Sequence, residues 1–467
     1  MAADSVIAEL RGAVKGEVIA PDDTGYDDAR KVWNGAIDRR PAAIVRAAGV
    51  EDVQAAVRIA PGHGVEIAVR GGAHSFGGAA TLDDGVVIDL GGMRKVAVDP
   101  STRRARVQGG AQWGDLDAAS QEHGLAVTGG FISHTGVGGL TLGGGMGWLT
   151  RKTGLTIDSL AGADVVTADG RALHASADEN AELFWALRGG GGNFGVVTEF
   201  DVRLHDVGPL CQLAFFFWPA DHGAEALRLA RDYIASLPED FGALIGGLTA
   251  PPAPFVPEKF QGAHGWGILI GGFGDPDKHA AAIGALRDGS PAFEFITPIP
   301  YVNLQQMFNE GNEPGVLGYE KALFLEQLTD GAIDVLARRL PEKRSPVSFL
   351  PIFVVDGASA RIPDDATAYG GPRSARYAVN IAGIAPPGET ELYEADRVWV
   401  RALWEELLPH AVGTGGYVNF MSEYDEDRVR ASYGAAKYER LARIKAEYDP
   451  DNIFHRMAAN IKPLVLA

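Results

Sequence analysis

The sequence predicts an α+β protein with two domains followed by a C-terminal segment, and three observations support this prediction. With 467 residues, the chain is longer than one hydrophobic core usually supports. Residues 1–206 are rich in glycine and in short apolar runs, whereas residues 207–410 alternate apolar strands with amphipathic helices and contain few glycine clusters. Residues 411–467 form a third zone that contains one predicted helix.

Helical patterns are few in the first zone. Residues 51–60 and 180–187 show the clearest ones, and Ser176 with Glu179 suggests a capping box that opens the second helix. Strands are predicted from apolar runs at residues 42–45, 65–69, 86–90, 163–167 and 196–202.

The second zone has the pattern of a sheet covered by helices. Strands are expected at 213–218 and 267–270, and helices at 224–236 and 390–408. Prolines at 251–257 and 298–300 predict exposed loops. In the third zone, a helix over 433–448 is expected to stop at Asp449-Pro450.

Composition and charge narrow the class of partner. The formal net charge of −19 disfavours a nucleic acid or an anionic membrane surface, since either would need a basic face. Cys211 is the only cysteine, so neither an intramolecular disulfide nor a thiolate metal cluster is expected, and we predict no metal site. Asp4, Glu9 and Arg11 interrupt the apolar core that a signal peptide needs. A cytoplasmic location is therefore expected, although a cysteine-poor exported protein would also fit.

The glycine-rich loop that follows the strand at 65–69 is the strongest local signal for function. It sets His74 among glycines, which permit positive φ angles and let successive backbone N–H groups point at one ligand oxygen. No Lys or Thr follows in the phosphate-loop pattern, so a mononucleotide kinase or ATPase is disfavoured. On its own, this loop fits a tight connection between strands as well as an anion site.

Two further glycine clusters, at 136–147 and 189–195, are candidates for ligand contact. Gly190, Gly192 and Gly195 match the spacing G-x-G-x-x-G, but they follow a predicted helix and precede a predicted strand. A dinucleotide-binding loop needs the opposite order, with the strand first and the helix second. We therefore reject a Rossmann fold, and the absence of HExxH and GxSxG motifs leaves hydrolase functions without support.

Five motifs in a fixed order are similar to a known family. They are RGGAHS at 70–75, TGVGGLTLGGG at 135–145, ELFWALRGGGGNFGVVT at 182–198, YVN at 417–419 and YDPDNIF at 448–454. Together they resemble the FAD-linked oxidases of the vanillyl-alcohol-oxidase type, in their berberine-bridge-enzyme-like branch, which have a PCMH-type FAD-binding domain. The resemblance implies an FAD-binding domain over 1–206, a substrate domain with an antiparallel sheet and covering helices over 207–410, and a segment over 411–467 that returns to the flavin.

The resemblance implies that His74 forms a covalent bond from a ring nitrogen to the 8α methyl group of FAD. A neutral imidazole is a good nucleophile near physiological pH, and the bond raises the oxidising power of the flavin. The alternative is a histidine that only hydrogen-bonds within its loop, and Arg70 fits a surface cation or one that screens phosphates. The implied FAD contacts are Val69, Arg70, Gly71, Gly72, Ala73, His74, Ser75, Gly78, Thr135, Gly138, Gly139, Thr141, Gly145, Gly195, Val197, Tyr417 and Asn419.

Some departures from the family pattern bear on the cofactor and on oxygen. Many members hold the flavin by a second bond to a cysteine, but Ile132 stands at that position, so a single link through His74 is expected. By analogy, this favours a small, apolar substrate over an oligosaccharide. Thr135 occupies the position that gates oxygen access in relatives, and its small side chain predicts an oxidase. Thr135 and Leu140 together also match members whose flavin carries oxygen at N5, so the resemblance leaves oxygenation of the substrate open as a second outcome. The third possibility is that Thr135 is only a turn residue.

The general base of the family is missing. Phe420 stands where plant relatives have a tyrosine, and Pro351 leaves no carboxylate where some bacterial relatives have one. An amine that enters deprotonated would need no base. Tyr417 and Tyr369 are the candidate catalytic hydroxyls, although either side chain would also fit a packed core, and Tyr369 more so.

These features predict an FAD-dependent oxidase. It would take a hydride from a C–H bond beside O or N of a small alcohol, amine or phenol, and molecular oxygen would be reduced to hydrogen peroxide. Two alternatives remain open. One is an oxidase of sugars or oligosaccharides, and the other is a flavin-binding protein without turnover.

Overall fold

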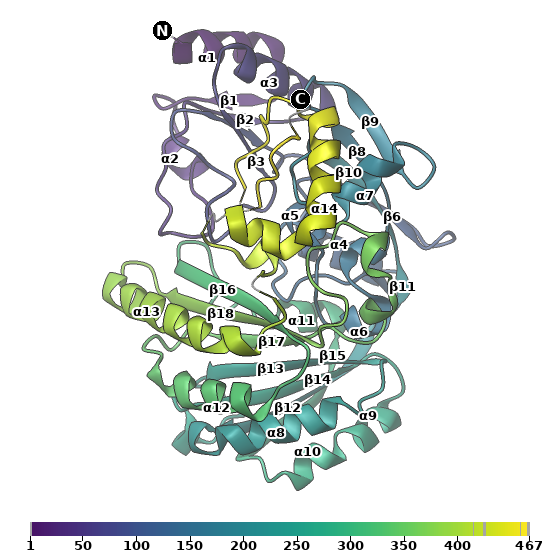
Figure 1. Ribbon diagram of the computed structural model, residues 1–467, viewed down its shortest axis with the longest axis vertical. Helices are drawn as coiled ribbons and strands as arrows, with labels where there is room; N and C mark the ends of the chain where they lie inside the picture. Colours follow the sequence, from purple (N-terminus) through teal and green to yellow (C-terminus); the bar gives the residue numbers. More distant parts are fainter. Residues whose placement is uncertain (1, 414, 424–425, 458, 465–467) are drawn as a thin grey trace.

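Four β-sheets organise the part of the chain that the computed structural model describes, which is residues 2–413, 415–423, 426–457 and 459–464 (Figure 1). The first sheet has the order β1-β2-β4-β3, in which β2, β4 and β3 run parallel and β1 is antiparallel. Its strands are β1 (Glu17–Ile19), β2 (Ala43–Arg46), β3 (Ile67–Arg70) and β4 (Val86–Asp89). The strands predicted at 42–45, 65–69 and 86–90 are thus confirmed.

Helices α1 (Ala2–Ala13) and α3 (Val50–Gly62) pack on the first sheet, and a short helix α2 (Tyr26–Ala29) follows β1. Helix α3 confirms the pattern at 51–60. Its apolar face, with Val53 and Val57, contributes fully buried side chains to a core that also contains Phe454 from the C-terminal segment. The start and the end of the chain therefore share one core.

The second sheet is antiparallel, in the order β5-β6-β10-β8-β9. Its strands are β5 (Val96–Asp99), β6 (Arg104–Gln108), β8 (Leu160–Val166), β9 (Ala172–Ser176) and β10 (Val196–Arg203), and β7 (Leu125–Ala126) pairs separately with β11 (His205–Asp206). The helices between them are α4 (Trp113–Gln121), α5 (Val137–Gly143), α6 (Thr150–Thr153) and α7 (Ala181–Leu187).

The capping box predicted for α7 is not formed. The hydroxyl of Ser176 accepts from the amide of Glu179 at 3.2 Å, but these residues build a turn ahead of the helix. The N-cap is Asn180, which has a positive φ of 50° and no capping hydrogen bond from its side chain. The helix itself begins at Ala181, within one residue of the prediction.

The third sheet has seven antiparallel strands in the order β15-β12-β14-β13-β17-β18-β16. They are β12 (Leu210–Pro219), β13 (Phe241–Thr249), β14 (His264–Gly272), β15 (Phe293–Pro300), β16 (Leu317–Leu325), β17 (Leu350–Val354) and β18 (Tyr377–Ala385). Helices α8 (Gly223–Ile234), α12 (Asp330–Arg339) and α13 (Thr390–Leu407) cover one face, and the shorter α9 (Pro276–Ala282), α10 (Gly284–Asp288) and α11 (Tyr301–Gln306) lie near its edge (Figure 1).

Alternation along these strands separates two cores. Phe216 and Trp266 pack under the covering helices, whereas Phe215, Leu269 and Phe324 belong to a core on the opposite face, together with Trp148 and other residues of the N-terminal half. The sheet is therefore buried on both sides, and its second face is the one that meets the rest of the molecule.

The prediction of a loop at residues 298–300 is wrong, because these prolines end strand β15. Strand β15 lies at the edge of the sheet, and within the described parts of the chain it pairs only with β12. A proline has no backbone N–H to donate, which an edge strand tolerates because its outer side has no partner strand. The prolines thus mark the end of the sheet.

Helix α14 (Glu426–Tyr448) starts before the predicted residue 433 and changes direction at Gly434, which has a φ of 70°. The ammonium of Lys445, fully buried, donates to the carboxylate of Asp449 at 2.5 Å and to the carbonyls of Asn193 and Phe454 at 2.7 and 2.9 Å. An ion pair whose donors are all satisfied is stable in a core. It ties the C-terminal segment to the glycine loop at 189–195.

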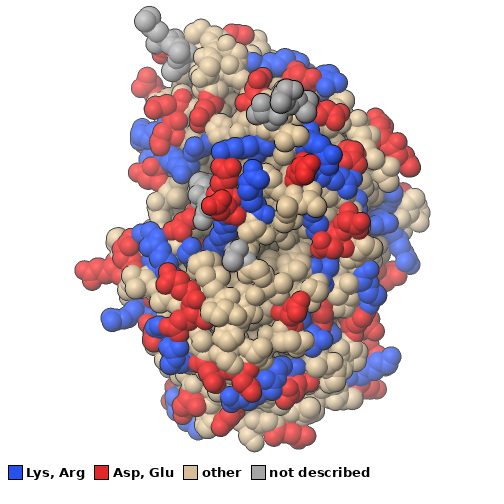
Figure 2. All heavy atoms as spheres, viewed as in Figure 1, with Lys and Arg blue, Asp and Glu red and all other residues tan. Residues whose placement is uncertain are grey.

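The surface mixes charges of both signs, and Figure 2 shows Lys and Arg interspersed with Asp and Glu over the face in view. In the described part of the chain, no helix is long and apolar enough to cross a membrane.

A buried acid joins the two halves of the molecule. Asp117 on α4 is 1% exposed, and its Oδ2 accepts from the amide of Gln305 on α11 at 3.3 Å, while its Oδ1 has no hydrogen-bond partner among the described residues. Burial raises the pKa of Asp117 to about 7. Since the unfolded carboxyl has an ordinary pKa near 4, the folded state loses stability as pH rises from about 4 to 7.

We expect Asp117→Asn to remove this pH dependence. The variant should gain on the order of 4 kcal/mol relative to wild type between pH 4 and pH 8, because its side chain has no proton to lose. Thermal unfolding of both proteins at pH 5, 7 and 8.5 measures the effect. A difference in stability that stays constant across these pH values would contradict it.

Candidate active site

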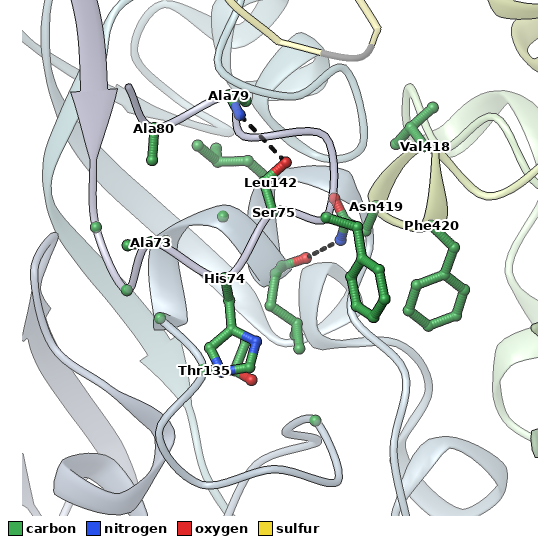
Figure 3. A pocket seen from close by; sticks show the side chains of 18 of the residues that line it. Ala73, His74, Ser75, Ala79, Ala80, Thr135, Leu142, Val418, Asn419 and Phe420 are labelled. Atoms are coloured by element: carbon green, nitrogen blue, oxygen red, sulfur yellow. Dashed lines mark hydrogen bonds between the residues drawn. The ribbon is translucent and has the colours of Figure 1, made fainter. Parts of the chain in front are cut away.

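A cavity of about 400 Å³ lies between the loops of the N-terminal half and the inner face of the seven-stranded sheet. One side is formed by three glycine-containing segments, which are the loop after β3 and the clusters at 136–147 and 189–195, together with the C-terminal segment. Strands β13, β16, β17 and β18 contribute to the other side. Figure 3 shows His74 on the first of these segments, with Asn419 and Phe420 projecting from the C-terminal segment. The motifs that lie apart in the sequence are thus brought together.

The backbone of the loop after β3 lies directly against the backbone of the segment that precedes α5. A Cβ atom on Gly72 would lie 2.2 Å from the amide nitrogen of Gly136, and one on Gly136 would lie 2.4 Å from that of Gly72. Only glycine fits at either position, because a backbone cannot yield as a flexible side chain does. Ala73 adopts a φ of 56° immediately before His74. The loop is therefore held in one strained conformation.

The imidazole of His74 is fixed on two sides. Its Nε2 lies 2.7 Å from Nδ1 of His134, and its ring stacks on Trp33 with a centroid distance of 4.7 Å. Burial, with a smaller contribution from His134, lowers the pKa of His74 to about 3. The ring is therefore neutral at physiological pH, and when its Nε2–H donates to His134, its Nδ1 keeps a free electron pair.

The C-terminal segment supplies a second set of polar groups. The hydroxyl of Tyr417 accepts from the amide of Gly145 and from Nδ2 of Asn419, each at 2.8 Å. Asn419 also donates to the carbonyl of Leu140 at 3.0 Å. Burial raises the pKa of Tyr417 well above its usual value, so the phenol keeps its proton. Tyr417 is a poor general base in this site.

The structure brings most of the predicted contact residues to the cavity wall. The predicted contact residues that line it are Val69, Gly71, Gly72, Ala73, His74, Ser75, Thr135, Gly138, Gly139, Gly195, Val197, Tyr417 and Asn419. The cavity is also lined by Leu140, Ile132, Pro351 and Phe420. Ile132, Pro351 and Phe420, at which the chain departs from the motifs that it resembles, therefore all line the same cavity.

Five predicted residues do not line the cavity. The guanidinium of Arg70 is buried behind the loop, where it donates to the carbonyl of Ala29 and lies 3.6 Å from Asp89. It therefore does not reach the cavity in which it was predicted to contact the cofactor. Tyr369 packs edge-on against Tyr417 and beside Gly144, and its side chain does not line the cavity. The remaining three are Gly78, Thr141 and Gly145. Gly145 acts indirectly, through its hydrogen bond to Tyr417.

Sequence reasoning missed four residues of the site. His134 and Trp33 hold the His74 ring, and Glu320 and Asn380 line the cavity from strands β16 and β18. Glu320 shares its face of β16 with Ala322 and Phe324, which are buried. A charged residue on an otherwise apolar strand face is the signal that would have indicated it.

The shape and lining of the cavity fit FAD. A ligand in the cavity meets backbone rather than side chains along one side, which is lined by Gly71, Gly72, Gly136, Gly138, Gly139 and Gly195. Aromatic and aliphatic side chains form much of the wall, as a flavin ring requires.

Comparison with known proteins agrees with this fit. Residues 41–176 match the family described as FAD binding domain, and residues 416–462 match the family described as berberine and berberine like. The chain is similar to (R)-6-hydroxynicotine oxidase of Paenarthrobacter nicotinovorans, with 33% identity over 97% of both chains. It is also 28% identical to an FAD-linked oxidoreductase of Dictyostelium discoideum, over 99% of this chain and 98% of that one.

The solved structures give the same result. The 6-hydroxy-D-nicotine oxidase of Arthrobacter nicotinovorans superimposes with a TM-score of 0.84 at 30% identity, over 97% of this chain and 99% of that one. A chitooligosaccharide oxidase shares the fold, with a TM-score of 0.85 at 22% identity over the full length of both chains. The fold and the site thus define an FAD-dependent oxidoreductase with the vanillyl-alcohol-oxidase type of α+β architecture. The chain belongs to the berberine-bridge-enzyme-like family of FAD-linked oxidases.

Proposed function

We propose that FAD binds in the cavity and is attached covalently through His74 alone. The observation that carries this proposal is the neutral imidazole held by His134 and Trp33 beside the glycine loop. The glucooligosaccharide oxidase of Acremonium strictum, 25% identical with a TM-score of 0.83, has a 6-S-cysteinyl, 8α-N1-histidyl FAD. Because Ile132 cannot form the sulfur bond, only the histidyl link is available to this chain.

The predicted site residues take these roles in the proposal. Backbone amides of residues 71–75 and 136–139 bind the phosphates, and Asn419 and Tyr417 bind the polar edge of the flavin. Gly195 and Val197 pack against the same ligand. Thr135 leaves the face towards oxygen open, because its side chain is small. In terms of domains, residues 1–206 and 411–467 hold the FAD, and residues 207–410 bind the substrate.

When bound, FAD supplies the acceptor for a hydride and passes the electrons to molecular oxygen, which leaves as hydrogen peroxide. The substrate we propose is a small organic molecule with a C–H bond beside O or N. The aromatic wall formed by Phe131, Phe308, Phe349, Phe353 and Phe420 supports an apolar substrate better than a sugar. The cytoplasmic location stays a prediction.

Peroxide formation tests the proposed function. The purified holoprotein should release hydrogen peroxide in air with at least one small alcohol, amine or phenol, and the same substrate should bleach its absorbance near 450 nm when oxygen is removed. A chitooligosaccharide and a xylooligosaccharide serve as comparison substrates. Turnover of these alone would favour a sugar oxidase, and no turnover across the set would favour a flavin-binding protein without activity.

A further inference from the structure

One acid on the cavity wall has no role in the proposed function. Glu320 lies in β16 and is 1% exposed, and its side chain lies on the face of the sheet that lines the cavity. Its strand neighbours Tyr319 and Lys321 point to the opposite face, where both contact Glu423. Glu320 is thus separated from the ion pairs of its own strand.

Among the residues that the structure describes, the Glu320 carboxyl has a single side-chain partner. Asn380 of β18 is the diagonal cross-strand neighbour of Glu320, and its Nδ2 donates to Oε2 of Glu320 at 2.9 Å. In the described part of the chain, Oε1 of Glu320 and Oδ1 of Asn380 have no hydrogen-bond partner, although both atoms are buried. Buried acceptors without donors destabilise a protein, because they lose their hydrogen bonds to water and gain none in return. This pair therefore presents two free acceptors to a ligand with N–H donors.

The rest of the wall near the sheet is apolar. Phe349, Pro351 and Phe353 line it from β17 and the residue before it, and Ala382 and Ile384 line it from β18. A ligand that satisfies this wall and the acceptor pair together needs an aromatic or aliphatic body and one basic nitrogen. Aromatic rings also stabilise a nearby ammonium group through cation–π contact.

The surroundings of the Glu320 carboxyl also favour a basic ligand, because a bound cation would supply the positive partner that the ionised form lacks. Burial raises the pKa of its carboxyl to about 8, against a smaller effect of the Asn380 amide, and no charged side chain contributes. Outside the pairing of the strands, the described groups that hydrogen-bond to Glu320 are Asn380 from β18 and Ser422, whose hydroxyl accepts from the backbone amide of Glu320; Arg456 also lines the cavity but does not contribute to the shift of this pKa. The carboxylate therefore has no cation of the described protein to compensate it.

We propose that Glu320 and Asn380 bind the basic nitrogen of an arylalkylamine substrate, and that Glu320 takes a proton from its ammonium group. In this step an N–H bond of the ammonium breaks and an O–H bond forms on the carboxylate, which leaves a neutral amine and a neutral acid. The nitrogen then carries the electron pair that it needs before hydride is removed from the adjacent carbon. This proposal rests on the proposed function and assigns its substrate class.

Binding of a cation and of its neutral analogue tests the proposal without turnover. Holoprotein whose flavin has first been reduced with dithionite, so that no hydride can be taken from the ligand, is titrated anaerobically at pH 8 with 2-phenylethylamine and with 2-phenylethanol, and binding is followed by calorimetry. Wild type should bind the amine at least about tenfold more tightly, as expected for a charge-assisted hydrogen bond. Glu320→Gln should lose this preference, because the new amide is neutral and directs N–H groups at the ammonium. Asp117→Asn, which neutralises a buried acid outside the cavity, should keep it.

The pH profile of wild type gives an independent readout. Affinity for the amine should rise about tenfold per pH unit from pH 6 to 7 and level off above pH 8, until the amine itself loses its proton near pH 10. Affinity for the alcohol should not change with pH.

Three outcomes would overturn the assignment of Glu320 as the group that binds the amine. They are equal affinity for both probes, binding of neither probe, and a preference for the amine that survives in Glu320→Gln. The proposed function fails separately. If peroxide is formed from alcohols while amines show no preference, the oxidase stands and the role of Glu320 is rejected.

Discussion

Acid-denatured His74→Ala protein is expected to release all of its flavin into the supernatant, whereas the wild-type pellet stays yellow and fluorescent. The physical reason is that His74 alone offers a neutral nitrogen with a free electron pair at this loop, since its pKa is lowered to about 3 and its other nitrogen is paired with His134. Ile132 offers no second attachment. The variant should still bind FAD before denaturation, because the backbone cradle is unchanged.

The same measurement on His123→Ala provides the control, since this side chain is exposed and lies outside the cavity. Its pellet should keep the colour of wild type. Colour released from wild type itself would leave a non-covalent flavoprotein, and the absence of any flavin would contradict the cofactor assignment. A covalent bond also shifts the flavin potential upward, so His74→Ala should oxidise its substrate more slowly.

Gly72→Ala is expected to lose most of its FAD and about 3 kcal/mol of stability. The new Cβ atom would lie 2.2 Å from the amide nitrogen of Gly136 and 2.6 Å from its Cα, and both are backbone atoms that cannot rotate away. The loop carrying His74 must then separate from the segment before α5, and overpacking of this kind typically costs 1–3 kcal/mol, occasionally more. The ratio of flavin to protein absorbance and the midpoint of thermal unfolding measure the two effects.

Gly62→Ala is the matched substitution, because no atom of the described residues lies within 4 Å of the Cβ it would add at the end of α3. It should retain full flavin content and the wild-type unfolding midpoint. A Gly72→Ala protein with both properties unchanged would show that the two loops do not depend on their close contact.

Regular elements with a clear apolar period could be predicted from the sequence. Strands β2, β4, β10 and helix α13 lie within a few residues of their predicted bounds. The exceptions have local causes. Helix α5 was hidden by its glycines, which disfavour a helix unless tertiary packing imposes one, and the prolines of β15 hid an edge strand.

The cofactor side of the site was more predictable than the substrate side. Residues 69–75 and 135–139 are contiguous motifs, so their sequence alone indicates a loop that binds a ligand. Arg70 shows the limit of this reasoning, since its guanidinium is buried and donates to the carbonyl of Ala29 rather than lining the cavity. Glu320 and Asn380 lie 60 positions apart and meet only through the pairing of β16 with β18. No local pattern reports such a pairing.

The anchoring of α14 by Lys445 has a consequence for the order in which the protein is made. The cavity wall draws on residues from Trp33 to Ala459, so it contains both early and late parts of the chain. On the ribosome, the N-terminal sheets can form while the later residues are still being added. The wall at Tyr417–Phe420 and the buried contact of Lys445 with Asn193 must wait until synthesis is nearly finished. Capture of the flavin is therefore a late event, and an unfinished chain has an open, incomplete site.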